Sequence, residues 1–90
     1  MAADQGGLRI GIFGGTFNPI HWGHLLLAET ARDELALDRV LFIPANQPPH
    51  KRERGLLSGA VRFELVQLAI RDQSAFVASD IELQRSDVSY

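Results

Sequence analysis

Short apolar runs alternate along the chain with stretches whose apolar residues are spaced as on a helix. The apolar runs extend from Leu8 to Phe13, from Arg39 to Pro44, and onward from Ala75. Short apolar runs ended by glycine or proline are typical of the buried strands of a parallel sheet. We therefore predict three strands, the first of them buried on both faces except at Arg9.

Two helices are predicted between these strands. The first is expected to place one apolar stripe on a single face, formed by Leu27, Ala28, Ala31 and Leu35. The second, capped by Ser58, is expected to do the same with Val61, Leu65, Leu68 and Ala69. Arg62 falls early in the second helix and is expected to be exposed, with reach to a functional site as the alternative.

The start of the first helix has two interpretations. Asn18 is a suitable N-cap, with Pro19 as the first helical residue. The alternative is a tight turn at Asn18-Pro19, with the helix beginning slightly later. In either case the order is β-α-β-loop-α-β, which predicts an α/β fold with a parallel sheet, the first half of a doubly wound arrangement.

Composition limits the classes of protein to consider. The chain has 90 residues, a formal net charge of −2, 46% hydrophobic residues and no cysteine. These values are typical of one globular domain and exclude disulfide or thiolate-metal frameworks. We expect a cytoplasmic protein, because the sequence shows no secretory signal and no apolar run long enough to span a membrane. The mild acidity argues against a nucleic-acid surface but not against a local anion site.

A glycine-rich segment follows the first predicted strand. Gly14, Gly15 and Thr16 would lie at the carboxyl end of that strand, where open α/β sheets bind their ligands. Two residues without Cβ atoms let a phosphate approach the backbone, and the threonine adds a hydroxyl donor. The alternative is that the glycines only permit a tight strand-to-helix turn.

Two histidines follow this segment. His21 and His24 are three residues apart and close to the positive end of the helix dipole. A polyphosphate would suit both rings, because each could donate to a non-bridging oxygen. The alternatives are a solvated His21 and a core-facing His24. A metal site is disfavoured, since His50 is the only other histidine and no third ligand is evident.

The segments "GGTFNPIHWGH" and "FIPANQPPHK", together with "SDIEL" and "SDVSY", resemble bacterial nicotinate mononucleotide adenylyltransferases of the H-x-G-H nucleotidylyltransferase superfamily. The resemblance implies a Rossmann-like fold and adenylyl transfer from ATP, with Mg²⁺, to nicotinate mononucleotide in NAD biosynthesis. It implies that His21 and His24 hold the ATP phosphates and that Lys51 reaches phosphate from its loop. The backbone of Gly14, Gly15, Thr16 and Phe17 would lie against nucleotide and mononucleotide.

Asn46 could hydrogen-bond near the nicotinate ring, and a turn-forming asparagine is the alternative. The family is longer than this chain and carries a Ser/Thr-rich motif ending in arginine, which the 90 residues lack. We therefore expect residues 1–90 to be the N-terminal part of a single nucleotidylyltransferase domain without its C-terminal half. The alternatives are another H-x-G-H adenylyl- or cytidylyltransferase, or a catalytically incomplete nucleotide-binding fragment.

Overall fold

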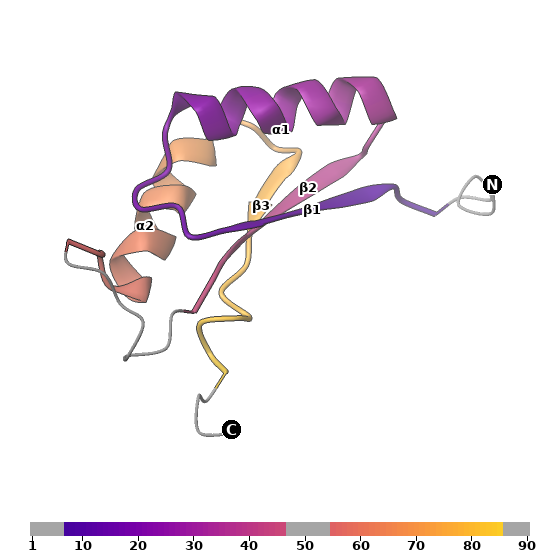
Figure 1. Ribbon diagram of the computed structural model, residues 1–90. Helices are drawn as coiled ribbons and strands as arrows, with labels where there is room; N and C mark the ends of the chain where they lie inside the picture. The colour runs from indigo at the N-terminus through magenta and orange to yellow at the C-terminus, as the bar shows by residue number, and fades with distance from the viewer. Residues whose placement is uncertain (1–6, 47–54, 86–90) are drawn as a thin grey trace.

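Three parallel strands and two helices form the part of the chain that the computed structural model describes, residues 7–46 and 55–85 (Figure 1). Along the sequence they are β1 (Ile10–Gly15), α1 (Trp22–Leu35), β2 (Arg39–Pro44), α2 (Gly59–Ile70) and β3 (Phe76–Ala78). The sheet order is β1-β2-β3, with β2 parallel to both neighbours. The predicted α/β class, the order of the elements and the parallel pairing are confirmed.

The helices cover only one face of the sheet. Along β2, Val40, Phe42 and Pro44 are buried, whereas Leu41 and Ile43 are half-buried and Arg39 is exposed. On β1, Ile10 and Ile12 are 50% and 65% exposed. The prediction that the first strand is buried on both faces is therefore wrong, because β1 is an edge strand whose second face is uncovered in the described structure.

An aromatic cluster forms the centre of the core. Phe42 is fully buried, and its ring centroid lies 5.4 Å from Phe13, 5.9 Å from Phe17 and 5.0 Å from Phe76. These rings come from β1, β2, β3 and the segment that follows β1. The core thus reaches the carboxyl end of β1, where Phe17 anchors the connection to α1.

Strand boundaries differ from the predicted ones at two places. β1 extends through Gly14 and Gly15, which pair in register with Ile43 and Pro44 of β2. The two glycines are therefore the end of a strand rather than a turn. β3 is only three residues long, because the chain turns after Ala78 instead of continuing extended.

The buried faces of the helices also differ from the predicted apolar faces. On α2 the buried residues are Arg62, Val66 and Ile70, while Val61 and Leu68 are 42% and 52% exposed. On α1, Ala28 is buried, but Leu27 and Leu35 are 59% and 56% exposed. None of the helices in the described part of the chain is long and apolar enough to cross a membrane.

Candidate phosphate-binding site

The connection from β1 to α1 is a compact turn built on Phe17. Phe17 has a φ of 50° and its side chain is only 2% exposed. A bulky residue in this left-handed region costs on the order of 1–3 kcal/mol, which the surrounding structure must offset. The peptide bond between Asn18 and Pro19 is cis, and α1 begins at Trp22. The later of the two predicted helix starts is therefore the one observed.

Both histidines cap the first turn of α1. His21 is the N-cap, and its Nδ1 accepts a hydrogen bond from the Gly23 backbone N–H at 3.0 Å. The Nδ1 of His24 accepts from the His21 backbone N–H, also at 3.0 Å. The pair is a capping box in which histidines replace the usual hydroxyl and carboxyl groups. Two otherwise unpaired helix donors are thereby satisfied by imidazole nitrogens.

This capping arrangement fixes the tautomer of each neutral ring. An imidazole whose Nδ1 accepts a hydrogen bond carries its proton on Nε2. Each of the two rings therefore presents an Nε2–H donor that the helix start does not use. The ring centroids are 4.0 Å apart, so the two donors belong to one small site.

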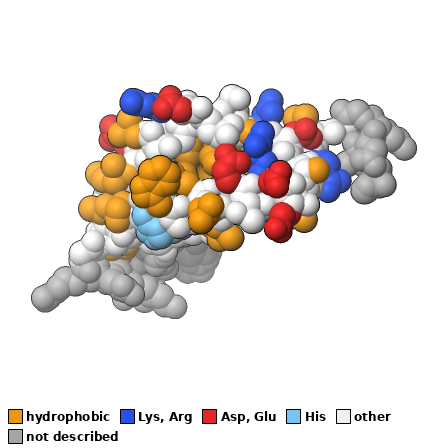
Figure 2. Space-filling view, turned by 90° about the horizontal axis from the view of Figure 1, so that it is seen from above, with side chains coloured by type: hydrophobic (Ala, Val, Ile, Leu, Met, Phe, Trp, Pro, Cys, Tyr) orange, Lys and Arg blue, Asp and Glu red, His pale blue; other side chains and the backbone are white. Residues whose placement is uncertain are grey.

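The two rings differ in their surroundings. His21 is exposed, whereas His24 is half-buried, 5.0 Å from the Phe17 ring and 6.1 Å from the Phe13 ring between centroids. Figure 2 shows histidine surface among hydrophobic side chains where α1 begins. Neither ring is simply solvated or fully enclosed in the core. The core-facing alternative thus applies to His24 only in part.

Burial lowers the pKa of His24 below that of an ordinary histidine, and the neighbouring His21 lowers it further. The neutral ring is therefore favoured in the folded chain. This is also the form that caps the helix, because a protonated Nδ1 cannot accept a hydrogen bond.

We expect the folded chain to lose stability as the pH falls below about 6.5, the pKa of an ordinary histidine. The folded pKa of His24 lies below that of the unfolded chain, so between the two values the unfolded chain binds more protons. The His24 contribution is complete above the unfolded value and is lost as the pH falls through the folded one. Urea denaturation at several pH values measures this slope, and His24→Gln should flatten it. An equal slope in both proteins would contradict the assignment.

Gly23 makes the paired arrangement possible. A Cβ at this position would lie 2.8 Å from Cε1 and 3.1 Å from Nδ1 of the His21 ring. Any side chain at position 23 would therefore displace the N-cap imidazole. The glycine between the histidines has a steric reason that the sequence pattern alone did not reveal.

A cleft of about 520 Å³ lies at the carboxyl ends of β1 and β2. It brings together four residues predicted from the sequence: Gly14, Gly15, Thr16 and Asn46. Ile12, Ile43, Ala45 and Glu82 complete its lining. A Cβ on Gly14 would meet only the Ile43 carbonyl oxygen, at 3.9 Å, so the fold itself does not require glycine there. The residues that line the cleft do not include His21 or His24, which lie at the start of α1.

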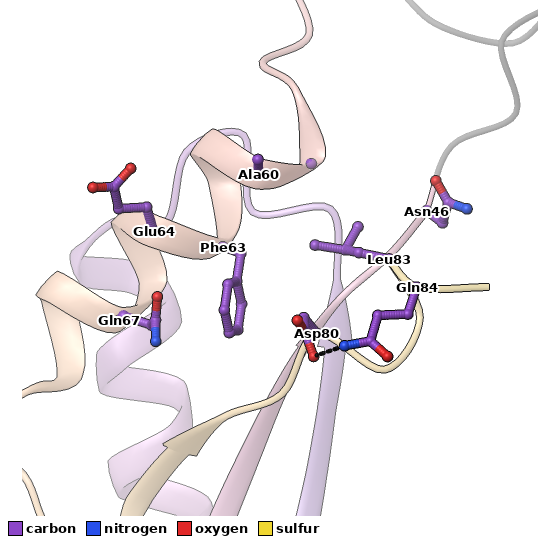
Figure 3. A pocket seen from close by; sticks show the side chains of 9 residues that line it. Asn46, Ala60, Phe63, Glu64, Gln67, Asp80, Leu83 and Gln84 are labelled. Atoms are coloured by element: carbon purple, nitrogen blue, oxygen red, sulfur yellow. Dashed lines mark hydrogen bonds between the residues drawn. The ribbon is translucent and has the colours of Figure 1, made fainter. Parts of the chain in front are cut away.

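A second cavity, of about 580 Å³, adjoins Asn46 on the side of α2 (Figure 3). It lies between α2 and the turn after β3, and Phe63, Asp80 and Leu83 contribute to its wall. Asn46 lines both cavities, and its Nδ2 donates to the Arg85 carbonyl oxygen at 3.3 Å. Its amide therefore stands on the boundary between the two.

The sequence did not place Glu82 in this region, and it placed Arg62 there only as the alternative to exposure. Glu82 lines the cleft and forms an ion pair with Arg85 at 3.0 Å. The sequence signal for this pair is the i, i+3 spacing of the two opposite charges. Arg62 is 2% exposed, so the prediction that it is an exposed helical arginine is wrong. Lys51 lies outside the described residues. Within the described residues no three His, Asp or Glu side chains gather as they would around a metal ion.

We expect Gly14→Ala to change ligand binding and Gly23→Ala to change the stability of the fold. Gly14→Ala should leave thermal stability nearly unchanged but weaken the binding of inorganic triphosphate, because its methyl group enters the cleft. Gly23→Ala should displace the His21 cap and cost about 1 kcal/mol of stability. Thermal melts and calorimetric titration with triphosphate measure both effects. Equal triphosphate affinity in Gly14→Ala and the unmodified chain would show that the cleft is not used.

Taken together, the parallel sheet, its β-α-β-α-β order of elements and the cleft at the strand ends define a Rossmann-like α/β domain. The sequence model of the cytidylyltransferase-like family matches residues 12–89. The chain belongs to the cytidylyltransferase-like family.

Several curated relatives are similar over most of this chain. A protein of Geotalea daltonii is 58% identical over 83 residues, which are 92% of this chain and 38% of the relative. Proteins of Desulfitobacterium hafniense and Clostridium botulinum are 54% and 45% identical over 82 residues, 91% of this chain and 40% and 41% of the relatives. All three bear the name probable nicotinate-nucleotide adenylyltransferase. The chain spans about two fifths of the length of these relatives.

Proposed function

We propose that this chain forms the phosphate-binding part of an adenylyltransferase that joins the AMP moiety of ATP to nicotinate mononucleotide. The products are nicotinate adenine dinucleotide and pyrophosphate, in the cytoplasmic synthesis of NAD. The observation that carries the proposal is the pair of imidazoles whose Nδ1 atoms are engaged in capping. The names of the relatives support the choice of substrates.

The chemistry requires positioning more than proton transfer. A phosphate oxygen of the mononucleotide attacks the α-phosphorus of ATP, and the bond from that phosphorus to the bridging oxygen of pyrophosphate breaks. The attacking phosphate is already ionised, so no general base and no protein nucleophile are needed. Positioning and stabilisation of the developing charge then account for the rate.

We assign the charge stabilisation to the histidines. The Nε2–H groups of His21 and His24 donate to non-bridging oxygens of the ATP phosphates, with His24 the principal donor in the transition state. An approaching polyphosphate also raises the pKa of His24, opposing the effect of burial. Mg²⁺ enters as part of the ATP substrate and neutralises phosphate charge.

We assign substrate contacts to the residues around the cleft. The open space above Gly14 lets phosphate approach the strand backbone, and Gly15 and Thr16 line the same cleft, where Thr16 adds polar groups. Phe17 contributes through its backbone, because its ring is buried in the core. Asn46 contacts the mononucleotide from the boundary of the two cavities, and Lys51 neutralises charge on the β- and γ-phosphates.

The proposal is tested by assaying the full-length gene product that contains this chain. ATP with nicotinate mononucleotide should yield pyrophosphate and nicotinate adenine dinucleotide, identified by mass spectrometry. Phosphopantetheine with ATP, and an alcohol phosphate with CTP, are the matched alternative substrates. Turnover of either alternative in place of nicotinate mononucleotide would overturn the choice of substrate. ATP binding without any turnover would support a nucleotide-binding module instead.

A further inference from the structure

Arg62 lies at the junction of three segments that surround the cleft. Its Nη1 donates to the carbonyl oxygens of Thr16 and Ala45, each at 2.9 Å. Its Nε donates to the Leu57 carbonyl oxygen, also at 2.9 Å. These carbonyls follow β1, follow β2 and precede α2, respectively. One guanidinium group therefore joins both strand ends of the cleft to the start of the second helix.

Other hydrogen bonds also connect the segments that Arg62 joins. The Ala45 backbone N–H donates to the Gly15 carbonyl oxygen at 2.8 Å, and the Leu57 backbone N–H donates to Asn18 Oδ1 at 2.9 Å. Arg62 adds three bonds to this set from a single rigid group. The Thr16 carbonyl that it holds precedes Phe17, whose left-handed backbone must be kept in place by its surroundings.

Arg62 itself does not line the cleft, although Thr16 and Ala45 do. Its side chain is almost fully buried on α2, one helical turn before Val66. A buried cation held by carbonyl dipoles is costly to remove, because its partners lose their donors at the same time. The guanidinium can therefore act on a ligand through the backbone that it holds.

We propose that Arg62 is a positioning residue that sets the separation between the Gly14–Thr16 edge and the Ala45–Asn46 edge of the cleft. The role extends to the chain after Gly55, because Leu57 is bound by both Arg62 and Asn18. This inference rests on the proposed function, because the effect of Arg62 is measured as a change in phosphate binding. It assigns phosphate affinity to a residue that touches no phosphate.

The test compares Arg62→Lys and Arg62→Met with Arg71→Met, a matched change at the exposed arginine that forms the C-cap of the same helix. Each variant of the full-length gene product is titrated with inorganic triphosphate by calorimetry, well below its melting temperature. We expect Arg62→Met to weaken binding by about 10- to 100-fold, as loss of hydrogen bonds from a charged group predicts. Arg62→Lys should fold but recover little affinity, because an ammonium cannot reproduce the planar fork. Arg71→Met should bind as the unmodified protein does.

An unchanged dissociation constant in folded Arg62→Lys, with only a lower melting temperature, would overturn the proposal and leave Arg62 a structural residue. Should the variants fail to fold, the unmodified protein supplies the second measurement. Its Arg62 Nε–H resonance should shift with triphosphate at the same concentrations as the Thr16 and Ala45 amides, and an unmoved resonance would also overturn the proposal. Triphosphate binding without adenylyl transfer would contradict the proposed function alone, since neither measurement depends on turnover.

Discussion

His24→Ala in the full-length gene product is expected to lower kcat by about 10²- to 10³-fold while changing KM for ATP much less. The imidazole Nε2–H is proposed to bind phosphate more strongly in the transition state than in the ground state. Removing one such preorganised donor typically costs about 3–4 kcal/mol of transition-state stabilisation. Steady-state kinetics with varied ATP measures the two constants separately. An unchanged kcat with a raised KM would contradict the role, because it would mean uniform binding of substrate and transition state.

His24→Gln separates this role from helix capping. Glutamine at the third helical position accepts from the N-cap backbone N–H, as in an ordinary capping box. The variant should therefore recover the stability that His24→Ala loses, without recovering the activity. Recovery of kcat together with stability would show that His24 acts only by holding the helix start.

Phe42→Ala is expected to destabilise the chain by about 3–5 kcal/mol, the usual cost of removing a buried phenyl ring. Phe42 is fully buried and contacts the rings of Phe13, Phe17 and Phe76, so the cavity would open at the centre of the aromatic cluster. The core of a chain this small is thin, and a loss of this size is comparable to the whole stability of many small domains. Urea denaturation followed by circular dichroism measures it.

Leu26→Ala is the control for this change. Leu26 on α1 is 69% exposed, so its truncation should change the free energy of unfolding by less than about 0.5 kcal/mol. Similar effects of the two substitutions would mean that Phe42 is not the centre of the core. The pair also tests whether the aromatic cluster holds Phe17 in place. If it does, loss of the Phe42 ring should loosen the β1–α1 turn and weaken triphosphate binding in Phe42→Ala but not in Leu26→Ala.

The elements of the fold could be predicted from sequence because they depend on local patterns. The run from Arg39 to Pro44 has a proline at its end and became β2 with the predicted bounds. Ser58 caps α2 as predicted, with its Oγ accepting from the Val61 N–H at 3.2 Å. The first strand was misplaced by two residues, since glycines suggested a turn where pairing with β2 continues.

The helix faces could not be predicted in the same way. Counting only apolar residues on α2 selected Val61 and Leu68, while burial follows Arg62, Val66 and Ile70 at i, i+4 spacing. A charged side chain enters the interior when carbonyl groups from distant segments converge on it, and no local pattern reports that. The cleft residues that follow the strands were easier to find, because parallel strands bring their carboxyl ends to one edge.

The capping role of the histidines could not be predicted from the sequence either. Their spacing indicated a shared side of the helix and a phosphate site, but the observed bonds run from Nδ1 to backbone N–H groups. Histidine is not a common N-cap, so propensity gave no signal. The glycine between them follows from the same geometry, because a Cβ at position 23 would meet the His21 ring.

The central claim is that His21 and His24 bind phosphate through Nε2–H while their Nδ1 atoms cap the helix. Nitrogen-15 NMR of the histidine rings tests it directly, recorded at about pH 8, above the pKa of an ordinary histidine, with and without inorganic triphosphate. We predict that both rings are protonated at Nε2 and unprotonated at Nδ1, and that triphosphate shifts the Nε2 resonances of both. Protonation at Nδ1, or Nε2 resonances that do not move at saturating triphosphate, would contradict the account.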